Sequence, residues 1–287
     1  MRHLRGEVDN MEDHQNMART FSTSVGILQA LRTYETYPDG TLRACILDDE
    51  VTILTPVGEL VPRYTDEGVR RKYNHSLSFF PSGKLKAIAL HERVPIMTSQ
   101  GEILAEHIVF YETGELHRVF PCNGRISGYW TQEDEQMLSR PHTVSWADQS
   151  LTARIMIFRF YTSGSLRSLT LWPGEKCAVQ TPIGEMNCRI GISFYENGAM
   201  QSIEPLAPVR VSLTSCSPAS AAAERLQKTD GFAYDCDATG LHGDSNSLRF
   251  SPEGKVISFV ADGERTMPML DLCGDCSSCA SASECKK

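Results

Sequence analysis

One short phrase recurs along this chain of 287 residues, and no other feature constrains its fold as strongly. The clear copies read FFPSGKLKAI from Phe79, FYETGELHRVF from Phe110, FYTSGSLRSL from Phe160, FYENGAMQSI from Phe194 and FSPEGKVISF from Phe250. A weaker copy surrounds residues 37–40. A phrase repeated this often predicts a chain built from one kind of supersecondary element.

The centre of each copy is a four-residue turn that ends in glycine. Proline occupies the second position in three of the six copies, where a type I turn requires φ of about −65°. A type I turn followed by a left-handed glycine, the G1 bulge, is a common connection between antiparallel strands. We therefore predict a β-hairpin at every copy, with the left-handed residue at Gly40, Gly83, Gly114, Gly164, Gly198 or Gly254.

The residues that flank each turn alternate in polarity. In the copy that begins at Phe110, we expect Phe110 opposite Leu116 and Ile108 opposite Arg118. The three apolar members of this set share one face, and five of the six copies have apolar residues at the same positions. Only the first copy departs, because Thr36 takes the phenylalanine position. One apolar and one mixed face is typical of a half-buried antiparallel sheet.

A second turn pattern alternates with the first. It reads TPVGEL from Thr55, TSQGEI from Thr98 and TPIGEM from Thr181, and two of the three place proline before glycine. Between the two patterns we expect further turns at LDDE (47–50), LHER (90–93) and LWPGE (171–175). The spacing predicts a three-strand meander as the repeating unit, present at least three times.

Two segments interrupt the repeats. Residues 131–140 begin with a capping-box pattern and are followed by Pro141, which predicts a short helix. Residues 217–228 begin with Ser-Pro, a typical helix start, and predict a second short helix.

We therefore expect a mainly β fold of repeated antiparallel hairpins and meanders, arranged as a long twisted sheet or a sandwich, with two short helices and flexible termini. The predicted segments are a flexible N-terminal tail (1–30), a first β-repeat half (31–125), a helical insertion (126–150), a second β-repeat half (151–270) and a Cys-rich tail (271–287).

The phrases FYENGAMQSI and FYETGELHRV resemble the variant MORN-type repeat, in which two aromatics, a polar pair and a glycine precede an apolar–basic strand. The resemblance is limited to the six hairpins, and the TPxGE turns depart from it. It implies an array of β-hairpins of the kind found in interaction and scaffold modules. It implies no catalytic residues, because such repeats share none.

The C-terminal tail carries the clearest chemical motif. Its cysteines follow the spacing C-x2-C-x2-C-x5-C, at Cys273, Cys276, Cys279 and Cys285. Four thiolates on a turning backbone suit a zinc ion or an iron–sulfur cluster. The first three resemble the opening of a bacterial ferredoxin cluster site, whereas the fourth spacing is longer and no second cluster motif follows. A disulfide or thiol-redox pair, and a solvated tail that binds metal only opportunistically, are the alternatives.

Other polar residues carry weaker hypotheses. Cys45, Cys177 and Cys188 fall in predicted strands, where a free cysteine is most often a small buried apolar residue. His107 and His117 lie on one predicted face, where they share a metal, flank a ligand or simply occupy the wetter side of the sheet.

Charge and composition exclude some functions. The net charge is −8 and Lys and Arg form no basic stripe in the sequence, which argues against nucleic acid and against an anionic membrane surface. Without an apolar signal segment the expected location is the cytoplasm. We predict a non-catalytic, cytoplasmic β-repeat binding or scaffold protein with a protein partner. Any metal that the protein binds is expected at its Cys-rich tail. The alternative is a zinc or iron–sulfur metalloprotein with a redox or sensing role, and a weaker one is an enzyme that uses His242 and Asp244.

Overall fold

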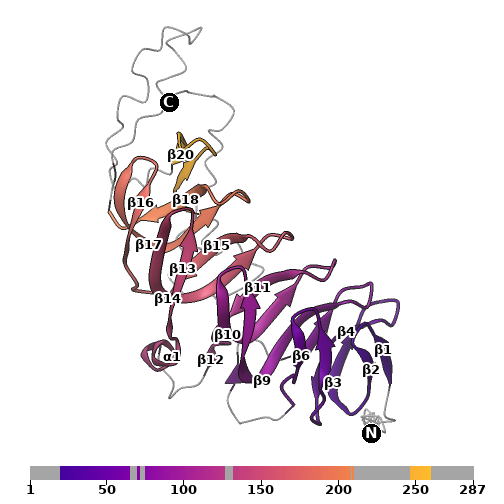
Figure 1. Cartoon of the computed structure of the whole chain (residues 1–287). Coiled ribbons are helices and arrows are strands. Elements are labelled where there is room, and N and C mark those ends of the chain that lie inside the picture. Colours follow the sequence, from indigo (N-terminus) through magenta and orange to yellow (C-terminus); the bar gives the residue numbers. More distant parts are fainter. Residues whose placement is uncertain are drawn as a thin grey trace, which may run out of the picture.

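A long antiparallel sheet dominates the computed structural model, which describes residues 20–64, 70–71, 75–126, 132–207, 209 and 246–259 (Figure 1). The expected mainly β fold is confirmed. In order of pairing, the sheet consists of β20 (Val256–Phe259), β19 (Leu248–Phe250), β18 (Met200–Pro205), β17 (Gly184–Phe194), β15 (Leu166–Leu171), β14 (Gln149–Phe160), β11 (Leu116–Phe120), β10 (Gly101–Phe110), β9 (Leu85–Thr98), β8 (Leu77–Phe79), β4 (Leu42–Leu47) and β3 (Leu31–Thr36).

Shorter strands complete the fold. β13 (Pro141–Trp146) pairs with β14, and β16 (Cys177–Thr181) pairs with β17. Three small sheets are formed by β1 (Phe21–Thr23) with β2 (Gly26–Leu28), β5 (Ile53–Thr55) with β6 (Gly58–Leu60), and β7 (Arg70–Arg71) with β12 (Arg125–Ile126). The pairing of β11 with β14 joins the two predicted repeat halves in a single sheet.

The six predicted hairpin turns are confirmed. Their glycines have φ between +76° and +110°. In the third hairpin the Gly114 amide donates to the Tyr111 carbonyl at 2.9 Å, and the Tyr111 amide donates to the Glu115 carbonyl at 2.8 Å. The same two bonds occur in the other five hairpins, so all six are type I turns closed by a left-handed glycine.

The predicted register is correct next to the turn and wrong beyond it. Phe110 lies opposite Leu116 as expected, but Ile108 lies opposite Val119 rather than Arg118. A β-bulge causes the difference, because it inserts one extra residue into the outgoing strand just after the turn. The fifth residue after each of the first five glycines therefore points into the core, and it is fully buried at Cys45, Ile88, Val119, Leu169 and Ile203.

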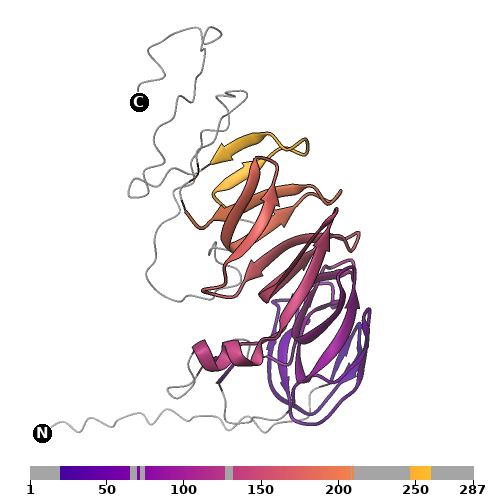
Figure 2. The same ribbon diagram turned by 60° about the vertical axis from the view of Figure 1, so that its left-hand side comes forward.

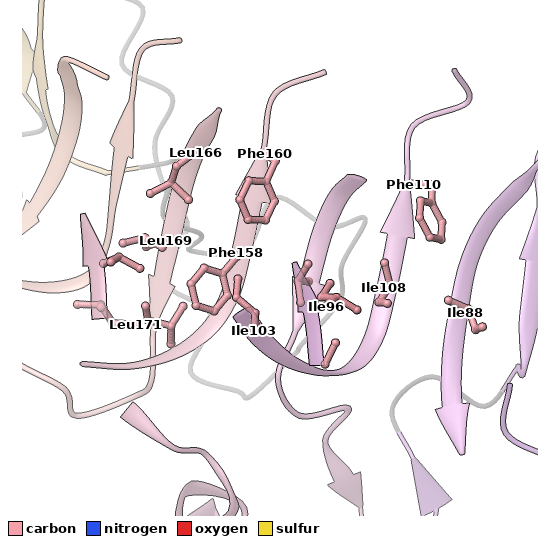
Figure 3. Packing of buried hydrophobic residues seen from close by; sticks show 14 of the residues in the cluster. Ile88, Ile96, Ile103, Ile108, Phe110, Phe158, Phe160, Leu166, Leu169 and Leu171 are labelled. Carbon is pink, nitrogen blue, oxygen red and sulfur yellow. The ribbon is translucent and has the colours of Figure 1, made fainter. Parts of the chain in front are cut away.

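A second layer of hairpins covers the apolar face of the long sheet. We call these the covering hairpins: β1–β2, β5–β6, and the ends of β9–β10, β13–β14 and β16–β17. Their inward side chains, such as Ile53, Ile96 and Val179, belong to the same core cluster as the sheet's phenylalanines. Figure 3 shows Ile96 and Ile103 among the apolar side chains of the sheet. The fold is thus a sandwich in which the chain passes repeatedly from one layer to the other.

The predicted repeating unit, a three-strand meander, leaves out part of the architecture, because it does not include the covering hairpins. The structure contains five of them among its described residues, including two that the TPxGE pattern missed, at Thr23–Gly26 and Trp146–Gln149. The chain bends at 48–49 and turns at 172–175, but 90–93 is no turn, because β9 continues from one layer into the other. In the Thr-x-x-Gly turns the threonine hydroxyl donates to the glycine carbonyl, at 2.7 Å between Thr55 and Gly58.

Contacts between turns close the sandwich at one end. The Ser24 amide donates to the Gly83 carbonyl at 3.1 Å, and the Ser24 hydroxyl accepts from the Leu85 amide at 3.0 Å. Further along, Pro182 of a covering turn lies so close to Gly254 that a β-carbon there would be 2.9 Å from the proline ring. The turns of the two layers therefore contact each other at both of these places.

The predicted N-terminal tail and the two predicted helices have different outcomes. The predicted N-terminal tail, 1–30, is wrong in its last part, because β1 and β2 form a hairpin there whose Phe21 and Leu28 are buried. The helix predicted over 131–140 is confirmed as α1 (Gln132–Leu138), which stands beside the ends of the strands (Figure 2). The helix predicted over 217–228 lies outside the described residues.

Candidate binding groove on the outer face of the long sheet

A single row of residues crosses the face of the long sheet that points away from the core. The successive pairings align one residue from each strand, and we call this set the outer row. From β3 to β19 it consists of Glu35, Ala44, Ser78, Ala87, Val109, Arg118, Arg159, Ser168, Ser193, Ser202 and Arg249. Most of its members are alanine or serine, so the row forms a low floor on this face.

Aromatic side chains form a ledge beside the outer row. They stand at the first position of the first five turns, at Tyr37, Phe80, Tyr111, Tyr161 and Tyr195. Each tyrosine of this aromatic ledge donates its hydroxyl hydrogen to a backbone carbonyl of the next hairpin, with distances of 2.8 or 2.9 Å. The ledge is therefore held in place by bonds that run along the sheet.

The bulge residue of several hairpins lies against the aromatic ring of its own turn. The Lys86 ammonium is 5.9 Å from the Phe80 ring centre, and the Arg167 guanidinium is 5.6 Å from that of Tyr161. The His117 ring stacks on Tyr111 with centres 4.2 Å apart. The β-bulge thus places a basic side chain at the foot of the ledge, where cation–π attraction favours it.

The floor and the ledge enclose a groove of about 480 Å³ over β8, β9, β10 and β11. Ser78, Ala87 and Val109 of the outer row form its floor. The complete lining is His75, Ser78, Phe80, Lys86, Ala87, His107, Val109, Phe110, Tyr111, Glu112, His117, Arg118 and Phe120. We call this cavity the outer groove.

The charges that line the outer groove are mostly basic. Lys86 and Arg118 contribute two cations, and Arg118 faces Arg159 across the β11–β14 pair. Glu112 is the one carboxylate in the lining, and it accepts a hydrogen bond of 2.7 Å from Ser82. In a chain of net charge −8, the lining of this groove is therefore a local excess of basic side chains.

The structure brings the two predicted histidines together in the outer groove. His117 stacks on Tyr111, whereas His107 is buried with its ring 5.3 Å from that of Phe120, in an edge-on contact. A third groove histidine, His75, which the sequence did not single out, lies 3.2 Å from Glu35. Within the described parts of the chain, no three His, Cys, Asp or Glu side chains are placed to hold a metal ion.

Other predicted site residues divide into two groups. Cys45, Cys177 and Cys188 are buried in strands, as expected. The tail cysteines Cys273, Cys276, Cys279 and Cys285, together with His242 and Asp244, lie outside the described residues.

No family model, curated protein or solved structure matches the chain. Among the described residues, none of the helical structure has the length and apolar character that a membrane-spanning helix needs.

Proposed function

We propose that the protein is a non-catalytic binding module that holds an acidic segment of a partner protein in the outer groove. The observation that carries this function is the basic lining of a groove of about 480 Å³ in a chain whose net charge is −8. Lys86 and Arg118 supply the cations, and aromatic side chains supply the wall. The resemblance to the variant MORN-type repeat implies an interaction or scaffold module, which agrees with this proposal.

The chemistry of the groove favours carboxylates on an extended peptide. The Arg118 guanidinium offers paired N–H donors that match a carboxylate, and Lys86 adds a more mobile point charge. The small floor residues Ser78 and Ala87 allow a peptide backbone to approach the sheet closely. Phe80 and Tyr111 then cover the apolar parts of the peptide.

The surroundings of the groove favour a short acidic segment over a long polyanion. The hairpin turns carry carboxylates at Asp39, Glu112, Glu115, Glu196 and Glu253. A nucleic acid laid along the ledge would pass several of these turns and meet repulsion at each one. A short peptide that stays over β8 to β11 avoids most of them.

A labelled poly-glutamate peptide of about eight residues, which spans about 26 Å when extended, tests the function directly. We expect fluorescence anisotropy to show saturable binding that weakens as salt is added. Lys86→Glu and Arg118→Glu should each weaken binding about tenfold or more. Lys255→Glu makes the same charge change as Lys86→Glu on an exposed residue outside the groove, and it should leave binding unchanged.

Three outcomes contradict the proposed function. The first is no binding of poly-glutamate to the unmodified protein. The second is an equal loss of affinity in Lys255→Glu, which would show an effect of net charge alone. The third is tighter binding of an oligothymidylate of matched length, which would make phosphate the preferred ligand.

A further inference from the structure

Two cysteines lie directly opposite each other in the last covering hairpin. The β16–β17 pair aligns Cys177 with Cys188, and both side chains are buried, with 7% and 0% of their surface exposed. Each thiol shifts the pKa of the other more than any other group does, as expected for two thiols in hydrogen-bonding contact. The other described cysteines, Cys45 and Cys122, have no cysteine among their strand partners.

This placement suits a disulfide without movement of the backbone. Directly opposed residues in an antiparallel pair have Cα atoms about 4.5–5.5 Å apart, which falls within the range of about 4.4–6.8 Å that disulfides occupy. We propose that Cys177 and Cys188 form a redox-active dithiol, which a peroxide oxidises to a cross-strand disulfide. The site is independent of the outer groove and of its ligand.

The position of each thiol assigns its part in the reaction. Cys177 is the first residue of β16, a strand whose one partner in the sheet is β17, and it follows the turn at Trp172–Glu175. Opening of this strand end exposes Cys177 first, whereas Cys188 is enclosed between β16 and β18. The hydrogen bond from Cys188 lowers the pKa of the Cys177 thiol, and the same bond raises the pKa of Cys188.

The reaction consumes one peroxide and releases two waters. The Cys177 thiolate attacks one oxygen of hydrogen peroxide, the O–O bond breaks, and the departing hydroxide takes a proton to leave as water. The sulfenic acid left on Cys177 is then attacked by the Cys188 sulfur, so that the S–S bond forms and the second water leaves. Two thiols are oxidised by two electrons in total, and the peroxide oxygens are reduced.

The disulfide would fasten the edge strand of the covering layer to its neighbour. Val179 and Met186 lie between the two cysteines and the turn, and both are buried against the core. Oxidation should therefore raise the thermal midpoint of the folded chain, and a thiol reductant should reverse the shift.

Trypsin offers a sharp test, because it cleaves after Lys176 and Arg189 and releases both cysteines in the single peptide 177–189. The full-length protein is treated with hydrogen peroxide, unfolded, alkylated and digested. We expect this peptide to appear without alkyl groups and lighter by two hydrogen atoms. In untreated protein the same peptide should carry two alkyl groups.

Single variants test the order of the steps. In Cys188→Ser, a sulfenic acid should accumulate on Cys177 and react with dimedone, whereas Cys177→Ser should give no adduct on Cys188. Free glutathione added to the same sample should become oxidised, which shows that the peroxide is active. Full alkylation of peptide 177–189 after peroxide, or its linkage to another cysteine of the chain, would overturn the assignment.

Discussion

The Tyr111 hydroxyl donates a hydrogen bond of 2.8 Å to the backbone carbonyl of Phe160, a residue 49 positions further along the chain. The same bond joins Tyr37 to Phe79, Tyr161 to Phe194 and Tyr195 to Phe250. Each bond ties the turn of one hairpin to the strand of the next, at the place where the backbone ladder ends. Phe80, which has no hydroxyl, interrupts the series.

Removal of one ledge hydroxyl should destabilise the fold. Tyr111→Phe keeps the ring and its stacking on His117, but it leaves the Phe160 carbonyl without its donor. We expect a loss of about 0.5–1.5 kcal/mol in the free energy of unfolding, measured by urea denaturation.

The reciprocal change serves as its control. Phe80→Tyr introduces the hydroxyl that the second hairpin lacks, at a position equivalent to Tyr111. It should stabilise the protein or leave it unchanged, because the four ledge tyrosines all donate to a phenylalanine carbonyl of the next hairpin, and Phe110 is the equivalent residue here. If Tyr111→Phe unfolds at the same urea concentration as the parent, the ledge bonds contribute nothing.

The hairpin glycines should differ in their tolerance of alanine. Gly198 has φ of +85° and nothing within 4 Å of an added β-carbon, so Gly198→Ala should cost about 1–2 kcal/mol through backbone strain alone. At Gly254 the added carbon would also meet the Pro182 ring at 2.9 Å. Thermal denaturation should therefore give Gly254→Ala a lower midpoint temperature than Gly198→Ala. The reverse order would argue against the contact between the two layers.

Local turn chemistry explains how much of the fold was predictable. The left-handed glycines and the apolar flanks lie within a few residues of each other, so the sequence alone indicated six hairpins and the burial of Phe110. Leu116 is partly buried and packs against the core. The helix before Pro141 was predicted for the same reason. The hairpin at Thr23–Gly26 was missed because it lies in a stretch assigned to a tail.

The candidate groove depends on features that no short stretch of sequence shows. The β-bulge reverses the sides of the outgoing strand, so Arg118 points to the outer face while Val119 is buried. The alignment of Arg118 with Arg159 needs the pairing of β11 with β14, which are separated by β12, α1 and β13. The sequence assigned His107 and His117 to one face. It could not show that small residues from different hairpins align to form the floor of the groove.

Burial of Cys45 should make the protein less stable at alkaline pH. Desolvation raises the pKa of this thiol to about 12, from an ordinary value of 9.0. Above about pH 9 the unfolded chain loses a proton that the folded chain keeps, so stability falls as the pH rises toward 12, by up to about 1.4 kcal/mol per pH unit. In Cys45→Ala, the free energy of unfolding measured by urea denaturation should decline less steeply between these pH values, although the variant is less stable overall.

The spacing of the tail cysteines predicts a bound metal. Elemental analysis and a visible spectrum of full-length protein purified without oxygen should show a zinc ion or an iron–sulfur cluster in a fixed ratio to the chain. A Cys276→Ser, Cys279→Ser double variant should lose it, whereas Cys45→Ala should retain it. Absence of metal from the unmodified protein would remove the metalloprotein alternative.

We expect the contribution of an ion pair to the free energy of unfolding to depend on how deeply the pair is buried. The Glu106 carboxylate is 8% exposed, lies 3.5 Å from Arg93 and accepts a bond of 3.0 Å from the Asn123 amide. The Arg32–Asp48 pair is shorter, at 2.7 Å, but its side chains are 39% and 50% exposed.

Water screens the exposed pair, so Asp48→Asn should cost less than about 1 kcal/mol. Glu106→Gln preserves the size of the side chain while leaving the half-buried Arg93 charge without its carboxylate, and it should cost about 1–3 kcal/mol. Added salt should reduce the loss of stability caused by Asp48→Asn more than the loss caused by Glu106→Gln, because buried pairs are screened less. Equal losses in the two variants, measured by urea denaturation, would show that distance rather than burial sets the strength of these pairs.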